Sequence, residues 1–258
     1  MNNYNLKKMN QRIPKIIHYC WLSSDPFPAA IQKSMKSWKE KLPEYDFVLW
    51  DFEKFNVSES IWVRQAFEAK KYAFAADYIR LYALYYHGGI YLDTDVEVVK
   101  NFDDLLGLPY FAGTEGGGWI EAGILASEKN ADWVKQCLDY FDKPFFKPDN
   151  SLDMITLPQI MNRIIQQQQT IEIASKEKII LNSQRDLGLV YYLFEKDFFC
   201  GKNMGTGVVT KTANTYTIHH FAMSWITPGH RFLPDIKRKL IKIFGEKLII
   251  GAIKIFKK

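Results

Sequence analysis

The chain has 258 residues, of which 47% are hydrophobic, so it can bury the core of one fair-sized domain and is not globally disordered. Its net charge of +5 is uneven, because residues 234–258 hold eight basic and two acidic side chains and carry +6, which leaves −1 for the rest. A nearly neutral body argues against a nucleic-acid binder, in which a basic stripe usually crosses the folded domain.

The cysteines and the N-terminal residues bear on the cellular compartment. Cys20, Cys137 and Cys200 are far apart and odd in number, which predicts neither a disulfide framework nor a zinc site and favours a reducing cytosol. Residues 1–12 are polar, without the apolar region of a secretory signal, and no uninterrupted apolar run reaches about 18 residues. We therefore expect a cytoplasmic protein without a spanning helix.

The first part of the chain alternates strands and helices. A strand, a helix and a strand are predicted over Ile13–Leu22, Ala29–Leu42 and Asp46–Asp51 from their β-branched content and apolar spacing. This order is typical of a parallel unit at the start of an α/β sheet. Two more helices are predicted over Ser58–Lys70 and Tyr72–His87, and a glycine pair ends the second.

The next stretch, Ile90–Val98, predicts a strand that carries an acidic pair. Apolar and polar residues alternate along it, so Asp93 and Asp95 share one face. Two neighbouring carboxylates repel each other and disfavour strands, and a bound divalent cation would remove that repulsion. A strand that bends after Asp93 could aim both side chains at one Mg²⁺ or Mn²⁺. A plain polar strand face is the alternative.

Shorter elements are predicted in the second half of the chain. Strands are expected over residues 109–114, 123–126, 179–181, 190–194 and 215–221, and helices over residues 131–141 and 156–168. Because no repeat or long linker interrupts them, we expect one domain over residues 13–232, preceded by a polar arm at residues 1–12.

The last segment, residues 233–258, predicts a basic amphipathic helix. Its isoleucine, leucine and phenylalanine residues are flanked by a dense set of lysines. Such a helix can lie in the interface of an anionic membrane, and the alternative is a helix that packs on the domain. A helix in the membrane interface would make this a peripheral protein at the inner face of a bacterial membrane.

Four sequence blocks occur in a fixed order: Ile13–Trp21, Ala75–Leu81, Gly88–Asp95 and Thr217–Trp225. Together they resemble the DXD-containing sugar transferases of glycosyltransferase family 32, particularly bacterial capsular-polysaccharide enzymes. They are more distantly similar to the catalytic core of the large clostridial glucosylating toxins. Four ordered blocks are far more specific than a single Asp-x-Asp.

The resemblance implies an α/β fold of the GT-A type, a Rossmann-like mixed sheet with helices on both faces and the nucleotide at the carboxyl ends of the strands. It implies a retaining enzyme that depends on Mn²⁺ or Mg²⁺. The donor would be a nucleotide-diphosphate sugar, with UDP-hexoses expected first. The acceptor would be a saccharide or lipid-linked saccharide in surface or capsular polysaccharide synthesis.

The resemblance also assigns residues to the donor. Trp21 would stack on the nucleotide base, although a core tryptophan is the alternative. Asp77 and Arg80 would hold the donor sugar, with Arg80 also near phosphate, although their spacing alone fits an intrahelical salt bridge. Ser224 and Trp225 would contact the diphosphate.

A second group of residues would form the floor of the nucleotide and metal site. Tyr91 would line the nucleotide pocket, Asp93 would contact ribose or metal-bound water, and Asp95 would bind the cation directly. His219 or His220 would supply a further metal ligand, and a structural histidine is the alternative for both.

Glu121 is a further candidate, on the acceptor or the sugar side of the site. The related enzymes more often have an amide there, so Glu121 leaves the donor and acceptor preference open. Two other functions remain possible on the sequence alone: a metal-dependent hydrolase of nucleotide sugars, and a non-catalytic sugar-binding module.

Overall fold

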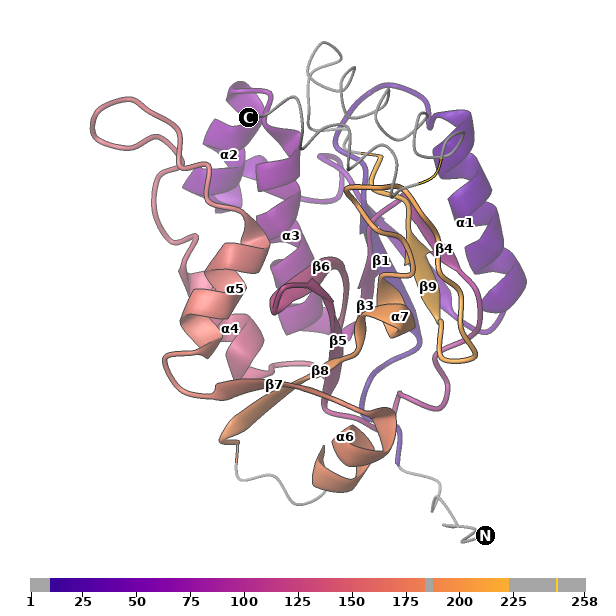
Figure 1. Ribbon diagram of the computed structural model, residues 1–258. Helices are drawn as coiled ribbons and strands as arrows, with labels where there is room; N and C mark the ends of the chain where they lie inside the picture. The colour runs from indigo at the N-terminus through magenta and orange to yellow at the C-terminus, as the bar shows by residue number, and fades with distance from the viewer. Residues whose placement is uncertain (1–9, 184–187, 223–244, 246–258) are drawn as a thin grey trace, which may run out of the picture.

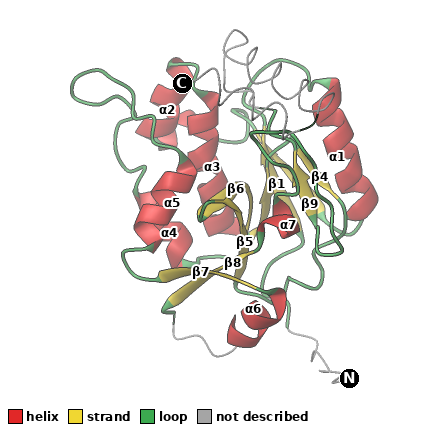
Figure 2. Cartoon of the chain, viewed as in Figure 1, coloured by secondary structure: helices red, strands yellow, loops and turns green. Residues whose placement is uncertain are grey.

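The computed structural model describes residues 10–183, 188–222 and 245 (Figure 1). Within these residues the chain forms a mixed seven-stranded sheet, in the order β2-β1-β3-β6-β5-β8-β7, and a separate two-stranded sheet of β4 and β9. Helices lie on both sides of the large sheet (Figure 2). The prediction of a mixed α/β fold is confirmed.

The predicted parallel unit opens the fold. Strand β1 (Ile16–Cys20), helix α1 (Ala29–Lys41) and strand β2 (Asp46–Trp50) follow in order. Strand β1 pairs in parallel with β2 on one side and with β3 (Gly89–Leu92) on the other. The carboxyl ends of these strands therefore meet at one edge of the sheet, where open α/β sheets usually bind ligands.

Helix α3 (Tyr72–His87) leads directly into β3. It follows a short 3-10 helix, η1 (Val57–Glu59), and helix α2 (Ile61–Glu68). The predicted glycine stop is confirmed, since Gly88 and Gly89 have φ of 66° and 105°. A Cβ on Gly89 would lie 2.7 Å from the carbonyl oxygen of Ile16, so glycine also lets β3 approach β1 closely.

The second half of the chain is partly as predicted. Its elements are β5 (Tyr110–Gly116), β6 (Trp119–Ser127), α4 (Asp132–Asp139), α5 (Leu157–Ile165), β7 (Thr170–Ala174), α6 (Lys176–Ser183), β8 (Val190–Phe194) and α7 (Lys196–Phe199). The predicted strand at residues 179–181 is wrong, because these residues lie within α6. Strand β7 was not predicted; its partner is the distant β8, so its pairing leaves no local signal.

The acidic stretch is not one strand. Strand β3 ends at Leu92, and the chain turns before β4 (Val96–Val98), which belongs to the small sheet. There β4 pairs antiparallel with β9 (Thr217–His219), so Val96 lies opposite His219. The single strand predicted over Ile90–Val98 is therefore wrong, because the chain turns between Leu92 and Val96, and this turn brings the late block of the chain beside the acidic pair.

Two hydrophobic clusters hold the layers together. Helices α2, α3, α4 and α5 cover one side of the large sheet, and Trp62 and Phe141 are buried there (Figure 1). Helices α1 and α7 and the small sheet cover the other side, with Trp38 and Phe102 buried there (Figure 1).

Some sequence predictions fall outside the described part of the chain. Residues 1–9 of the polar arm do so, as do all but one residue of the predicted amphipathic segment 233–258. Among the helices that the structure describes, none combines the length and the apolar character needed to cross a bilayer.

Candidate active site

An irregular segment of β6 forms the wall of the site. Ala112 of β5 pairs with Leu125 of β6, and Thr114 of β5 pairs with Ile120 of β6. Between these two pairs the chain advances by two residues on β5 and by five residues on β6. Bulges of this kind re-aim side chains near active sites. Here the bulge contains Glu121, Ala122 and Gly123.

The bulge presents its backbone to the acidic turn. The carbonyl oxygen of Gly123 accepts the N–H of Asp93 at 2.8 Å. The carbonyl oxygen of Ala122 accepts a hydrogen bond from Nη1 of Arg80. The bulge therefore holds both the acidic turn and the helix α3 side chain that lies beside it.

The turn after β3 brings three ligand-type atoms together. The N–H of Val96 donates to the carbonyl oxygen of Asp93 at 3.0 Å, which closes the turn. Nε2 of His219 lies 3.2 Å from Oδ1 of Asp95 and 4.0 Å from Oδ2 of Asp93. Among the described residues, these three offer ligand atoms within 4.8 Å of one another. Two carboxylates and an imidazole suit Mn²⁺, so the donor set fits the predicted cation.

Backbone groups fix the second aspartate of the pair. The N–H of Ala222 donates to Oδ2 of Asp95 at 2.6 Å, and the N–H of His220 donates to the Asp95 carbonyl oxygen at 3.1 Å. Oδ1 is the oxygen that faces His219. The side chain of His220 is not part of this group, because its Nε2 lies 2.8 Å from Glu97 instead.

Glu121 lies behind His219. It is 2% exposed, and its Oε1 lies 3.0 Å from Nδ1 of His219 while it accepts the Gly123 N–H at 2.8 Å. A proton on Nδ1 would donate to this carboxylate and leave Nε2 as the metal-binding nitrogen, an arrangement common behind histidine ligands. The structure thus places Glu121 against a candidate ligand, whereas the sequence suggested the sugar or acceptor side.

The charges of the site depend on one another. Burial acts to lower the pKa of His219, but Glu121 and Asp95 outweigh it and raise this pKa well above its usual value. Burial likewise acts to raise the pKa of Asp95, and His219 with the Ala222 N–H lowers it to about 2. Without a cation, these carboxylates therefore favour the imidazolium form of His219, and a metal that binds Nε2 must displace its proton.

Arg80 joins helix α3 to the acidic turn. Its side chain is 7% exposed, and Nη2 lies 3.0 Å from Oδ1 of Asp93 and 3.4 Å from Oδ1 of Asp77. Its guanidinium carbon lies 4.3 Å from the centre of the Tyr91 ring. Asp93 therefore has one oxygen on Arg80 and the other toward His219. The pair Asp77 and Arg80 is an intrahelical ion pair that also belongs to the site.

The remaining predicted residues lie at different depths. Trp21 follows β1 at the same sheet edge and is half-buried, with its indole N–H on the carbonyl oxygen of Asp25 at 2.7 Å. Tyr91 is 1% exposed and lies under Arg80, so it forms part of the core rather than an open wall. Ser224 and Trp225 lie outside the described residues.

Sequence reasoning did not single out Gly123. A Cβ at this position would lie 2.8 Å from Cε1 of His219, so only glycine leaves room for the histidine. The one available signal was the position of Gly123 itself, two residues after the candidate Glu121.

Comparison with known families adds to this geometry. Residues 28–112 match the family model described as "Glycosyltransferase sugar-binding region containing DXD motif". This region includes Arg80, Asp93 and Asp95. The predicted glycosyltransferase region with its DXD motif is thereby confirmed.

Two curated relatives are fungal. Mannosyl phosphorylinositol ceramide synthase SUR1 of Saccharomyces cerevisiae is 29% identical over 164 residues, which cover 61% of this chain and 43% of the relative. Inositol phosphoceramide mannosyltransferase 3 of Schizosaccharomyces pombe is 30% identical over 128 residues, covering 48% of this chain and 36% of the relative. The chain thus spans less than half the length of either relative.

A solved structure, the PaToxG glycosyltransferase, is 21% identical with a TM-score of 0.48. The match covers 68% of this chain and 75% of that one.

Proposed function

We propose that the chain is a divalent-metal-dependent glycosyltransferase of the GT-A type that transfers a hexose from a nucleotide-diphosphate sugar. The observation that supports this most is the convergence of Asp93, Asp95 and His219 at the carboxyl end of β3. The two aspartates belong to the region that matches the DXD family model. The fungal relatives are named as mannosyltransferases or mannosyl-lipid synthases, so mannosyl donors join UDP-hexoses as candidates.

Asp95, His219 and Asp93 would hold the cation. Bound there, Mn²⁺ or Mg²⁺ would supply positive charge to the diphosphate leaving group. Arg80 adds a fixed positive charge beside Asp93, and its burial strengthens its electrostatic effect. Asp77 and Arg80 would orient the donor sugar, and Trp21 would stack on the base. Among the described residues no nucleophile is evident, so we propose front-face transfer with retention.

The finer proposals concern partners and location. We propose that residues 13–232 form the catalytic domain and that residues 233–258 bind an anionic membrane surface. The acceptor would be a saccharide or lipid-linked saccharide at the inner face of the membrane, used for surface or capsular polysaccharide. The names of the two fungal relatives refer to an inositol phosphoceramide, which supports a lipid-linked acceptor.

The substitution Asp95→Asn tests the metal assignment. It keeps the size of the side chain but removes the charge, so Mn²⁺-dependent release of nucleotide from UDP-hexoses or GDP-mannose should fall at least about 100-fold. The exposed Asp142→Asn is the matched control and should retain activity. Both variants should show the wild-type circular dichroism spectrum.

The same assay separates the alternatives. Unchanged activity of Asp95→Asn would remove the metal assignment. Turnover that does not respond to any acceptor would identify a nucleotide-sugar hydrolase. Sugar binding without turnover of any donor would favour the non-catalytic module.

A further inference from the structure

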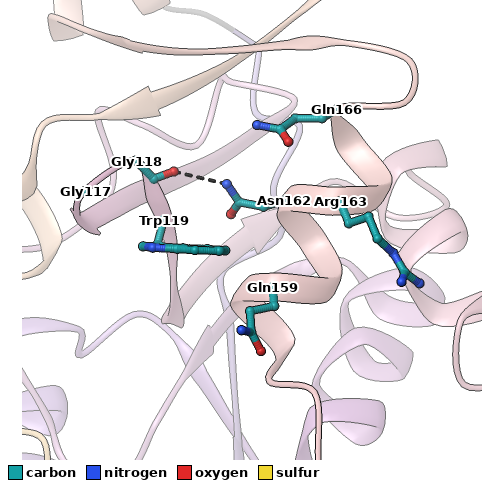
Figure 3. Close-up of a pocket in the computed structure, with 7 residues that line it drawn as sticks. All are labelled: Gly117, Gly118, Trp119, Gln159, Asn162, Arg163 and Gln166. Atoms are coloured by element: carbon teal, nitrogen blue, oxygen red, sulfur yellow. Dashed lines mark hydrogen bonds between the residues drawn. The ribbon is translucent and has the colours of Figure 1, made fainter.

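A pocket of about 400 Å³ lies beside the candidate active site, between the β5–β6 hairpin and α5 (Figure 3). The hairpin contributes Gly117, Gly118 and Trp119. Helix α5 and its C-terminal residue contribute amide side chains, among them Gln159 and Gln166. None of these residues has a role in the function proposed above.

The wall that carries Trp119 is fixed in place. Asn162 of α5 is buried, donates from Nδ2 to the carbonyl oxygen of Gly118 at 3.1 Å, and accepts the N–H of Ile120 on Oδ1 at 3.2 Å. The hydroxyl of Thr114 donates to the carbonyl oxygen of Trp119 at 2.9 Å. Because both neighbours of Trp119 are bonded to α5, its backbone is held before any ligand arrives.

The pocket combines an aromatic face with neutral amides. Trp119 is 42% exposed, and its indole extends toward α5 in Figure 3. The Gln159 carboxamide oxygen accepts the N–H of Thr156 at 3.1 Å, which fixes that amide. Arg163 also lines the pocket, but its guanidinium lies over the ring of Tyr140, 5.4 Å from the ring centre, and points away in Figure 3.

These features match the chemistry of a sugar ring. A hexopyranose has an apolar C–H face that can cover an indole, and a rim of hydroxyls that donate and accept as amides do. A phosphate would need a cation aimed into the pocket, and the described lining residues offer only Arg163, which is engaged with Tyr140. The lining therefore favours a neutral saccharide over an anionic group.

Both walls of the pocket connect to the candidate active site. Trp119 precedes Glu121 by two residues on β6, so their Cα atoms are about 7 Å apart. Helix α5 begins at Leu157, whose backbone N–H acts to lower the pKa of Asp77. Both walls of the pocket thus continue into segments that carry residues of the candidate site.

We infer that this pocket is a subsite for a neutral saccharide unit of the acceptor, with Trp119 as its stacking platform. The inference rests on the proposed function, because only a transferase needs an acceptor next to its donor. It adds the site and the chemical class of that acceptor, which the metal cluster alone does not define.

Saturation-transfer NMR on the full chain tests the subsite, with maltose, cellobiose, lactose and mannobiose as probes. At least one disaccharide should bind at millimolar concentration. Trp119→Ala should weaken its binding at least about tenfold, and Trp119→Tyr should retain most of it. The control is Tyr86→Ala, which removes an equally exposed aromatic ring from α3 and should leave binding unchanged.

Binding that is unaffected by Trp119→Ala, or no binding of any of the four disaccharides, would overturn the inference. Mn²⁺-dependent binding of UDP and of GDP, measured in parallel, separates this result from the fate of the proposed function. A wild-type chain that binds the nucleotide but none of the disaccharides removes the subsite and leaves the proposed function standing. Disaccharide binding that depends on Trp119, without Mn²⁺-dependent binding of either UDP or GDP, removes the transferase and leaves a saccharide site.

Discussion

The substitution Gly123→Ala tests how closely the candidate metal site is fitted. The added Cβ would lie 2.8 Å from Cε1 and 2.9 Å from Nδ1 of His219, and 2.9 Å from Oε1 of Glu121. Carbon atoms in contact are normally about 3.5–4.0 Å apart, so the ring has to move by at least about 0.7 Å. Gly123 is not among the glycines with positive φ, so the substitution adds a side chain without straining the backbone.

The size of the effect follows from the tolerance of metal sites. Ligand distances usually hold within about 0.2 Å, so a shift of about 0.7 Å takes Nε2 of His219 out of range. Disturbing the partner of a histidine ligand typically lowers metal affinity about 10–100-fold. We expect a loss of this size for Mn²⁺, together with a loss of stability of about 1–3 kcal/mol from overpacking.

Titration of Mn²⁺, followed by the electron paramagnetic resonance signal of the free ion, measures the change. Gly205→Ala is the matched control, because its Cβ would meet only Oδ1 of Asn203, at 3.4 Å. It should bind Mn²⁺ like the wild type. A folded Gly123→Ala protein whose Mn²⁺ affinity stays within about twofold of the wild type would refute the view that Glu121 and His219 shape the cation site.

Two further predictions concern Asp77 and the last segment. Burial raises the pKa of Asp77 to about 6, and Arg80 opposes this increase only in part. The protonated carboxyl therefore stabilises the fold fully below its unfolded pKa near 4, and this stabilisation is lost as the pH rises through about 6. Asp77→Asn should therefore increase the free energy of unfolding at pH 8 by up to about 3 kcal/mol, with no gain at pH 3, in urea titrations; an equal gain at both pH values would contradict this. Removal of residues 236–258, with their eight basic side chains, should abolish sedimentation with anionic vesicles, and unchanged sedimentation would exclude this segment as the membrane contact.

The sequence predicted the elements whose signals are local. The helix over Tyr72–His87 and its glycine stop are both predictable, because the apolar spacing and the glycine pair are properties of residues that are neighbours in the sequence. The run Ile179–Leu181 was misassigned because three apolar residues do not distinguish a strand from a turn of helix. Ser175 was the overlooked signal, since its hydroxyl accepts the N–H of Lys178 at 3.4 Å where α6 begins.

The site was predictable in its components and not in its connections. The pair Asp93 and Asp95 stood out by residue type and spacing, and His219 and His220 were assigned through the family resemblance. The structure brings the two aspartates together with His219. The choice between His219 and His220 depends on the register of β4 with β9, and the position of Glu121 depends on the bulge in β6. Both are set by pairing between distant strands, which single-sequence patterns do not contain.

The pairing of β4 with β9 has a consequence for the order in which the site forms during synthesis. The acidic turn leaves the ribosome more than a hundred residues before His219, so a nascent chain first exposes two repelling carboxylates and an unpaired edge of β4. Only the arrival of β9 covers that edge and places the imidazole between Asp95 and Glu121. A chain interrupted before residue 217 therefore lacks the third candidate ligand of the proposed cation site.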